Sequence, residues 1–220
     1  MDFFKSISAV FWDWDGTLVD SFSFLNSAHN HVRQQFGMGV FSEDEFGVYF
    51  GKPREILYRD IYGAENVEEA KEYFETYVTQ NHHKILPIDG AERLLDGFHQ
   101  RGLPMGIVTN KKGRFVQAEI AHHGWEHYFK TVVGAGEAEA DKPSSAPLLL
   151  ALEKSNLMLK TSEVLFVGDT ENDVLCAHEA GANIAFIHKD KNEQNFAKQH
   201  GAELIFSTCD EFADFLLHHG

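Results

Sequence analysis

Cysteine and positive charge are both scarce in this sequence. Two cysteines, Cys176 and Cys209, stand among 220 residues, which is too few for a disulfide framework, and they lack zinc-ligand spacing. Nineteen Lys and Arg face 34 Asp and Glu, a net charge of −15, so the chain has no overall basic surface for nucleic acid or an anionic membrane. No apolar run approaches the roughly 18 residues of a membrane span, and the first one stops at Asp13, unlike a signal peptide. These absences predict a cytoplasmic protein with no nucleic-acid or membrane partner.

Short apolar runs alternate with amphipathic segments along most of the chain. The runs, each as long as a buried strand, cover 7–12, 105–109, 131–134, 164–168, 184–187 and 204–206. Helical patterns lie between them, one from Ala91 to a stop at Gly102 and others over 113–123, 148–154 and 173–180. Buried strands that alternate with helices predict an α/β fold: a Rossmann-like three-layer core in which helices cover both faces of a parallel sheet.

Residues 21–87 break this alternation, because none of their segments has the pattern of a strand. Apolar side chains there recur at helical spacing, as in Leu25, Ala28, Val32 and Phe36. Ser42 and Glu45 match a capping box at the start of a helix. The sequence therefore predicts two domains: an α/β core made of 1–20 and 88–220, and a small all-helical domain made of 21–87.

A pair of carboxylates follows the first predicted strand. Asp13 and Asp15 stand two residues apart in the segment Asp-Trp-Asp-Gly-Thr at 13–17, so both can project from the carboxyl end of the strand, where open α/β sheets place their sites. Two carboxylates this close repel, which separates them into a nucleophile and a general acid or base. A polar turn with two solvated acids is the alternative. An EF-hand loop is excluded, because Gly16 comes two positions too early and Phe24 stands where the closing Glu is needed.

A second acidic cluster follows the predicted strand at 164–168. Asp169 stands at the strand end and Asp173 four residues further on, where a helix begins. Capping of that helix by an acid is the alternative interpretation. Together with Asp13 and Asp15, the cluster places four carboxylates at one edge of the sheet. Such a group needs a hard divalent cation with oxygen ligands, and Mg²⁺ fits.

Three polar residues follow the other predicted strands. Thr109 and Asn110 close the strand at 105–109, and their hydroxyl and amide can donate to a phosphate oxygen. Lys142 comes after the run at 131–134, and a cation near four acids would balance them and hold a phosphoryl group. Each has an ordinary alternative, namely a strand-to-helix turn for Thr109 and Asn110 and a solvated surface charge for Lys142.

These four segments resemble the motifs of the haloacid dehalogenase superfamily in identity, order and approximate spacing, and the resemblance covers essentially the whole chain. They are most similar to its phosphatase branch with a small helical cap, the branch of phosphoglycolate phosphatase and beta-phosphoglucomutase. The resemblance implies that Asp13 is the nucleophile, Asp15 the general acid and base, and Lys142 the lysine of the third motif. It also implies that Thr109 binds phosphate. A Mg²⁺ site is implied at the four acids Asp13, Asp15, Asp169 and Asp173.

The same resemblance narrows the reaction. Haloacid dehalogenases lack the second acid of the first motif, so the presence of Asp15 favours phosphoryl chemistry. Arg54 stands where phosphonoacetaldehyde hydrolases carry a Schiff-base lysine, and Leu25 stands where beta-phosphoglucomutases carry a histidine. Arg54 also belongs to a segment, 51–55, that is similar to the Gly-x-x-Arg-Glu cap segment of the mutases. It is therefore a candidate to bind a second anionic group of the substrate, and a solvated arginine paired with Glu55 or Asp60 is the alternative.

The resemblance thus implies a Mg²⁺-dependent phosphatase that hydrolyses a small phosphorylated metabolite through an aspartyl-phosphate, as phosphoglycolate phosphatases do. Phosphoryl transfer of the beta-phosphoglucomutase type is one alternative. A catalytically silent binding module is the other, although silent members usually lose the nucleophile or a metal-binding acid, and both are present here.

Overall fold

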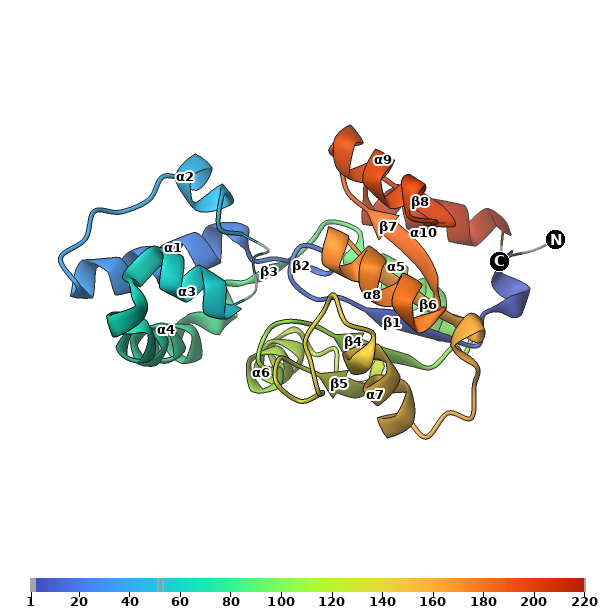
Figure 1. Ribbon diagram of the computed structural model, residues 1–220. Coiled ribbons are helices and arrows are strands. Elements are labelled where there is room, and N and C mark those ends of the chain that lie inside the picture. The colour runs from blue at the N-terminus through green and yellow to red at the C-terminus, as the bar shows by residue number, and fades with distance from the viewer. Residues whose placement is uncertain (1–2, 51, 53, 220) are drawn as a thin grey trace. The chain divides into compact units, whose positions relative to one another are not determined.

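The computed structural model of the protein describes residues 3–50, 52 and 54–219 (Figure 1). Gly51 and Pro53, two residues of the segment compared with the mutases, lie outside the described residues. The chain forms two compact units: a core unit, Met1–Val19 with Pro87–Gly220, and a helical unit, Asp20–Leu86. Within the described ranges, every helix is too short or too polar to cross a membrane.

A six-stranded parallel sheet with the strand order β5-β4-β1-β6-β7-β8 forms the centre of the core unit. Its strands are β1 (Ala9–Trp12), β4 (Met105–Val108), β5 (Phe129–Val133), β6 (Val164–Gly168), β7 (Asn183–Ile187) and β8 (Leu204–Phe206). Each coincides with or overlaps one of the apolar runs predicted as strands. The first strand, β1, lies in the middle of the sheet between β4 and β6.

Helices cover both faces of this sheet, as Figure 1 shows. They are α5 (Ala91–Gln100), α6 (Gly113–His123), α7 (Ala146–Lys154), α8 (Glu171–Ala180), α9 (Lys191–Gln199) and α10 (Cys209–His219), with short 3-10 turns at Phe3–Ser6 and Thr161–Glu163. Neighbouring side chains of a strand point to opposite faces. Phe11 of β1 accordingly belongs to one buried cluster with Val174 of α8, whereas Trp12 meets Phe98 of α5 edge to face, with 5.5 Å between ring centroids. The predicted three-layer α/β core is confirmed.

The parallel sheet determines where the polar loops lie. Its strands all run the same way, so the loops that follow them leave from one edge. The ladder continues one residue past two of the strands, because the Asp13 N–H donates to the Val167 carbonyl at 2.8 Å and the Thr109 N–H to the Val133 carbonyl at 3.0 Å. Because β1 lies between β4 and β6, loops that are far apart in the sequence meet at this edge.

The helical unit contains α1 (Phe22–Gln35), α2 (Glu43–Gly47), α3 (Arg54–Tyr62) and α4 (Val67–Asn81), with 3-10 turns at Ala64–Asn66 and His82–Lys84. The predicted capping box of α2 is present, since the Glu45 N–H donates to Ser42 Oγ at 3.3 Å and the Ser42 N–H donates to Glu45 Oε2 at 2.8 Å. The expectation that 21–87 lacks strands was wrong at its end. β3 (Leu86–Pro87) pairs with β2 (Val19–Asp20), because the two connections between the units form a two-stranded sheet.

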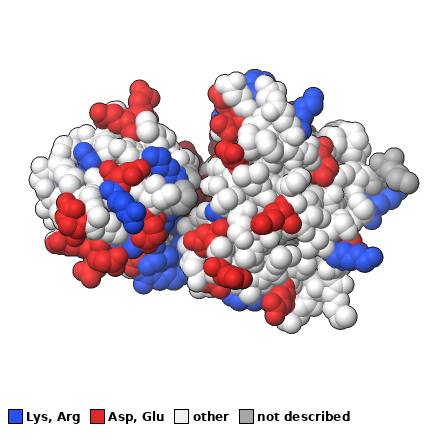
Figure 2. Space-filling model, viewed as in Figure 1, with Lys and Arg blue, Asp and Glu red and all other residues white. Residues whose placement is uncertain are grey.

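Acidic and basic side chains are interspersed on the face of the helical unit that Figure 2 shows. The helical unit contains ion pairs of this kind: Lys71 of α4 contacts Glu55 at 2.8 Å and Glu68 at 3.0 Å, and Lys52 contacts Asp60 of α3 at 3.0 Å. Exposed pairs of this kind each contribute roughly 0–1 kcal/mol. Part of the acidic excess in the helical unit is therefore neutralised by ion pairs with lysines.

His29 of α1 is buried inside the helical unit, with 3% of its surface exposed. Its ring centroid lies 4.7 Å from that of Phe74, and its Nδ1 is 2.8 Å from the Tyr62 hydroxyl. Burial, reinforced by the positive charges of Arg54 and Arg33, lowers the pKa of His29 from 6.5 to about 3. The folded unit therefore holds a neutral imidazole at this position.

We expect the helical unit to lose stability as the pH falls below 6.5. Folding disfavours protonation of His29, so each pH unit between 6.5 and about 3 costs ~1.4 kcal/mol, or about 2 kcal/mol at pH 5. Urea titrations followed by circular dichroism measure this loss, and intrinsic fluorescence reports the core unit, where all three tryptophans lie. The pH dependence should largely vanish in His29→Gln and persist in His31→Gln, which changes an exposed histidine of the same helix. An unchanged dependence in His29→Gln would contradict the assignment.

Candidate active site

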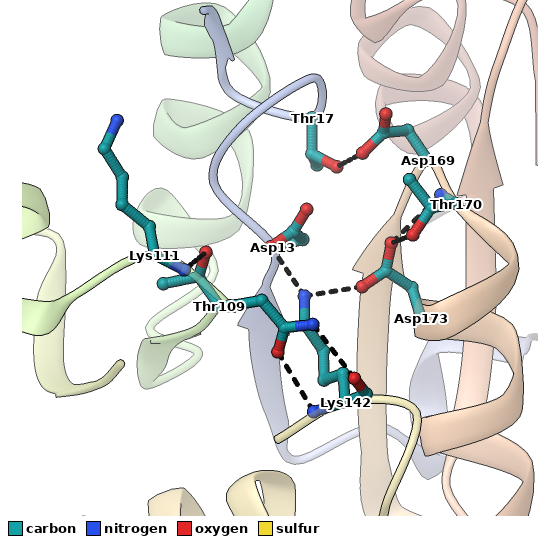
Figure 3. Close-up of polar contacts among 9 residues, drawn as sticks. Asp13, Thr17, Thr109, Lys111, Lys142, Asp169, Thr170 and Asp173 are labelled. Atoms are coloured by element: carbon teal, nitrogen blue, oxygen red, sulfur yellow. Dashed lines mark hydrogen bonds and ion pairs between the residues drawn. The ribbon is translucent and has the colours of Figure 1, made fainter. Parts of the chain in front are cut away.

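Lys142 lies at the centre of a polar cluster at the carboxyl edge of the sheet (Figure 3). Its Nζ donates to Asp13 Oδ1 and to Asp173 Oδ1, both at 2.6 Å, and only 4% of the residue is exposed. Burial acts to lower the pKa of Lys142, but Asp13 and Asp173 outweigh it and raise the pKa, so the side chain is an ammonium. Three of the residues predicted from separate motifs thus form one buried ion-pair group.

Asp169 faces the loop that follows β1. Thr17 Oγ1 donates to Asp169 Oδ1 at 2.6 Å. Gly16, next to Thr17, has a φ of +88°, which residues with a side chain rarely adopt. A Cβ atom at Gly16 would also lie only 2.2 Å from Asp169 Oδ2. The glycine of the first motif is therefore required both by its backbone conformation and by the close approach of Asp169.

Asp173 uses its two carboxylate oxygens differently. Oδ2 accepts hydrogen bonds from the Thr170 N–H at 3.0 Å and the Thr170 hydroxyl at 2.6 Å, in a capping box at the start of α8. Oδ1 accepts from Lys142. Asp173 is therefore the N3 residue of the capping box, with Thr170 rather than Asp173 at the N-cap, while its other oxygen contacts Lys142.

Three carboxylates of this cluster are close enough to share one cation. One oxygen from each of Asp13, Asp169 and Asp173 lies within 4.8 Å of the others, and all three residues are buried. Burial raises the pKa of Asp13 from 3.8 to about 7, with Lys142 opposing, and raises the pKa of Asp169 well above its ordinary value. If all three carboxylates ionise, they and the Lys142 ammonium leave two negative charges, which a bound cation would compensate. An all-oxygen, doubly negative group fits a hard divalent cation such as Mg²⁺.

Thr109 and Asn110 take different places at the end of β4. Thr109 is buried, and its Oγ1 accepts from the Lys111 N–H at 3.2 Å, so the hydroxyl keeps its own hydrogen to donate. Asn110 instead bonds to the backbone of Lys142, where its Nδ2 donates to the carbonyl at 2.9 Å and its Oδ1 accepts from the N–H at 3.0 Å. The Asn110 amide thus fixes the loop that carries Lys142, whereas the sequence predicted that it would donate to phosphate.

Asp15 is held by a different cation from Asp13. Lys111 Nζ lies 3.0 Å from Asp15 Oδ1, and it also contacts the buried Glu119 at 2.7 Å. Burial acts to lower the pKa of Lys111, but Asp15 and Glu119 outweigh it and raise the pKa. Two carboxylates that stand two residues apart therefore have separate environments, and separate environments allow separate roles.

Residues 10–187 match the family of haloacid dehalogenase-like hydrolases. The chain belongs to this family. It is 29% identical over 223 residues to a phosphoglycolate phosphatase from Vibrio parahaemolyticus, covering 96% of this chain and 94% of that protein. It is 31% identical over 188 residues to one from Yersinia pestis, covering 81% and 79%. A haloacid dehalogenase-like hydrolase from Streptococcus pneumoniae shares the fold, with a TM-score of 0.84 at 23% identity over 96% of this chain and 99% of its own.

The resemblance inferred from the motifs is confirmed at the level of this hydrolase family, and the matched range contains every predicted site residue. Arg54 is the one that belongs to the helical unit. Its Nη2 forms an ion pair with Glu75 Oε1 at 2.9 Å, and both side chains are about one-fifth exposed. The partners expected in the alternative interpretation, Glu55 and Asp60, pair instead with Lys71 and Lys52.

Four polar residues of this haloacid dehalogenase-like site were not predicted from the sequence: Thr17, Lys111, Glu119 and Thr170. Lys111 and Thr170 adjoin predicted residues and Thr17 lies two positions after Asp15, so their places in or beside the motifs were a usable signal. The sequence signal for Glu119 was weaker. Glu119 follows Phe115 by four residues and precedes Ile120, so it lies on the apolar side of α6, where an acid needs a buried partner.

Proposed function

We propose that this hydrolase is a Mg²⁺-dependent phosphatase that acts on a small phosphorylated metabolite through an aspartyl-phosphate at Asp13. The observation that carries the proposal is the buried group in which Lys142 joins Asp13 to Asp173, with Asp169 beside them. A phosphoryl group needs such a cation, and a carboxylate nucleophile needs its charge compensated. The relatives named phosphoglycolate phosphatase support the same substrate class.

In the first half-reaction, Asp13 attacks phosphorus and forms an acyl phosphate. The bond from phosphorus to the substrate oxygen breaks, and Asp15 gives that oxygen a proton. In the second half-reaction, Asp15 takes a proton from the attacking water, and the bond between phosphorus and Asp13 breaks. Asp15 suits this exchange because it is one-fifth exposed, whereas Asp13 is almost buried.

The other site residues compensate charge. Lys142 and the Thr109 hydroxyl stabilise the transferring phosphoryl oxygens, and Asn110 and Asp173 keep Lys142 in place. Asp13 and Asp169 would hold Mg²⁺ together with the backbone carbonyl of Asp15, and Asp173 would contribute through water or through Lys142. When bound, the ion supplies positive charge that reduces the repulsion between the nucleophile and the phosphate.

We propose that the helical domain at 21–87 is a cap domain, whose role is to control access to the active site. The acyl phosphate is reactive, so the site must exclude stray water yet admit substrate. The chain passes between the two units at two short connections, around β2 and β3, and these are the natural hinges.

A screen of small phosphate esters with Mg²⁺ tests the proposed function. We expect release of inorganic phosphate from an aryl phosphate and, more efficiently, from 2-phosphoglycolate or another small phosphorylated acid or sugar. Isomerisation of a hexose phosphate without net phosphate release would identify the mutase instead. No turnover of any ester, with the substrates bound, would identify a silent binding module.

Arg54→Ala is expected to raise KM for a substrate with a second anionic group by about 10-fold or more, because a guanidinium binds a carboxylate or phosphate with two parallel hydrogen bonds. Activity on a plain aryl phosphate should change little. Steady-state kinetics on 2-phosphoglycolate and p-nitrophenyl phosphate separate these effects. Arg59→Ala is the matched control, since Arg59 is an exposed arginine of the same helix. Equal effects of Arg54→Ala on both substrates, or none, would remove Arg54 from substrate binding.

A further inference from the structure

A buried line of polar contacts leads from Asp15 into the core unit. Lys111 Nζ lies 3.0 Å from Asp15 Oδ1 and donates to Glu119 Oε2 at 2.8 Å. The same Glu119 oxygen accepts a hydrogen bond from Trp14 Nε1 at 2.6 Å. Glu119 and Trp14 are both fully buried. None of these contacts involves the cluster around Lys142.

Burying the Glu119 carboxylate carries a large free-energy cost of desolvation. Among the described residues Glu119 is the one buried acid outside the aspartate cluster. Removing a carboxylate and an ammonium from water costs several kcal/mol per ion, and an apolar pair of similar volume often gives equal or greater stability. If these positions only filled space in the core, leucine or methionine would serve as well. The Lys111–Glu119 ion pair therefore indicates a function that depends on its charges.

The contacts of Glu119 show what that function is. Trp14 precedes Asp15 in the loop after β1, and its indole packs edge to face on Trp125, with 6.0 Å between ring centroids. Lys111 belongs to the loop after β4, next to Asn110, which fixes the backbone of Lys142. One carboxylate on α6 thus ties together two loops that carry the reacting groups.

We infer that Glu119 is a positioning residue for proton transfer at Asp15: it anchors Lys111, and Lys111 fixes Oδ1 of Asp15 so that Oδ2 faces the leaving oxygen. The inference rests on the proposed phosphatase activity. In this arrangement Asp15 protonates the departing alkoxide as its bond to phosphorus breaks and later recovers a proton from water. Lys111 and Glu119 exchange no proton in either step.

Leaving groups that differ in their need for a proton provide the test. The value of kcat/KM reports the steps up to the first release of product, so it isolates loss of the leaving group from hydrolysis of the acyl phosphate. Dinitrophenolate leaves without a proton, whereas the alkoxide of 2-phosphoglycolate requires one. In Glu119→Gln, kcat/KM should fall about 10- to 100-fold for 2-phosphoglycolate and by less than about 3-fold for 2,4-dinitrophenyl phosphate.

Two further variants keep the test decisive. Glu92→Gln is the matched control, because Glu92 also accepts from an indole, that of Trp125 at 3.4 Å, but is exposed and, among the described contacts, is not hydrogen-bonded to Asp15 or Lys111. The double variant Lys111→Met/Glu119→Gln removes both charges together and so avoids an unpaired buried ion if the single variant does not fold. It should show the same selective loss.

The outcomes separate the inference from the proposed function. A wild-type protein that hydrolyses neither ester with Mg²⁺ would refute both. Active wild type with an equal loss on both esters in Glu119→Gln and in the double variant would leave the phosphatase standing and reduce Glu119 to a structural residue. No loss on either ester would overturn the inference as well. A selective loss on 2-phosphoglycolate, absent from Glu92→Gln, supports it.

Discussion

Asp13→Asn is expected to lower kcat by roughly 10⁴-fold or more, because an amide has nearly the shape of a carboxylate but is a far poorer nucleophile toward phosphorus. The substrate should still bind, since Lys142 and Thr109 are unchanged. Phosphate release from the best substrate of the screen measures the loss. Acid quenching during turnover, followed by peptide mass analysis, should detect a phosphorylated Asp13 peptide in the wild type and none in the variant.

The same substitution should not destabilise the metal-free fold. Burial raises the pKa of Asp13 from 3.8 to about 7, so the folded state favours the protonated form, and ionisation costs stability as the pH rises from about 4 to about 7. The pKa difference of Asp13 between the folded and unfolded states corresponds to roughly 4 kcal/mol. Asn avoids this cost of ionisation, but its hydrogen bond to Lys142 is weaker, so the net gain in stability is smaller. Metal-free Asp13→Asn should therefore melt at or above the wild-type temperature at pH 7.

Asp89→Asn is the matched control for this experiment, because Asp89 is an exposed carboxylate of the same unit. It should leave turnover unchanged. Substantial activity of purified Asp13→Asn would remove Asp13 from the nucleophile's role. A large drop in its melting temperature would mean that the carboxylate is needed for the fold, and the kinetic loss would then need another explanation.

Chelation of divalent metal should abolish turnover, and Asp169→Asn should do the same at ordinary Mg²⁺ concentrations. Three buried carboxylates that share one ammonium need further positive charge before a phosphate dianion can approach them. Asn replaces one anionic ligand by a neutral one, while Thr17 can still donate to the amide oxygen. Activity should return in the chelated wild type when Mg²⁺ is added back.

Thermal melting gives a readout of the metal that does not depend on catalysis. A ligand that binds only the folded state stabilises it by about 2.7 kcal/mol at 100 times its dissociation constant. The melting temperature of the wild type should therefore rise with Mg²⁺, and that of Asp169→Asn should rise much less. Full-rate hydrolysis by metal-free protein, or equal shifts of both melting curves, would show that these carboxylates do not form a metal site.

The strand ends that carry the acids could be predicted from sequence, because the apolar run of the strand and the acid that follows it are both local features. A continuous apolar run such as Val164–Gly168 specifies a buried strand, and the next residue must leave it at the sheet edge. α9 and α10 were not predicted. α9 is polar nearly throughout and buries only Ala197, so its apolar side is too narrow to recognise as a periodic pattern.

Side-chain partners were the part that sequence could not provide. Asn110 has the composition of a phosphate donor, but its partner is the backbone of Lys142, 32 residues later. Lys111 and Glu119 are eight residues apart on a loop and a helix, and their pairing depends on how α6 packs beside Trp14. Such contacts follow from tertiary packing, which no local pattern encodes.

The central position of β1 has a consequence for how the protein is made. Its neighbours β4 and β6 come much later in the chain, and the contacts that complete the site join residues 129 and 152 positions apart. A ribosome therefore releases Asp13 and Thr17 long before it synthesises their partners, Lys142 and Asp169 respectively. Until then β1, which becomes fully apolar core, has both hydrogen-bonding edges open. We expect the nascent chain to depend on chaperones during this interval, and slow translation ahead of β6 to lengthen it.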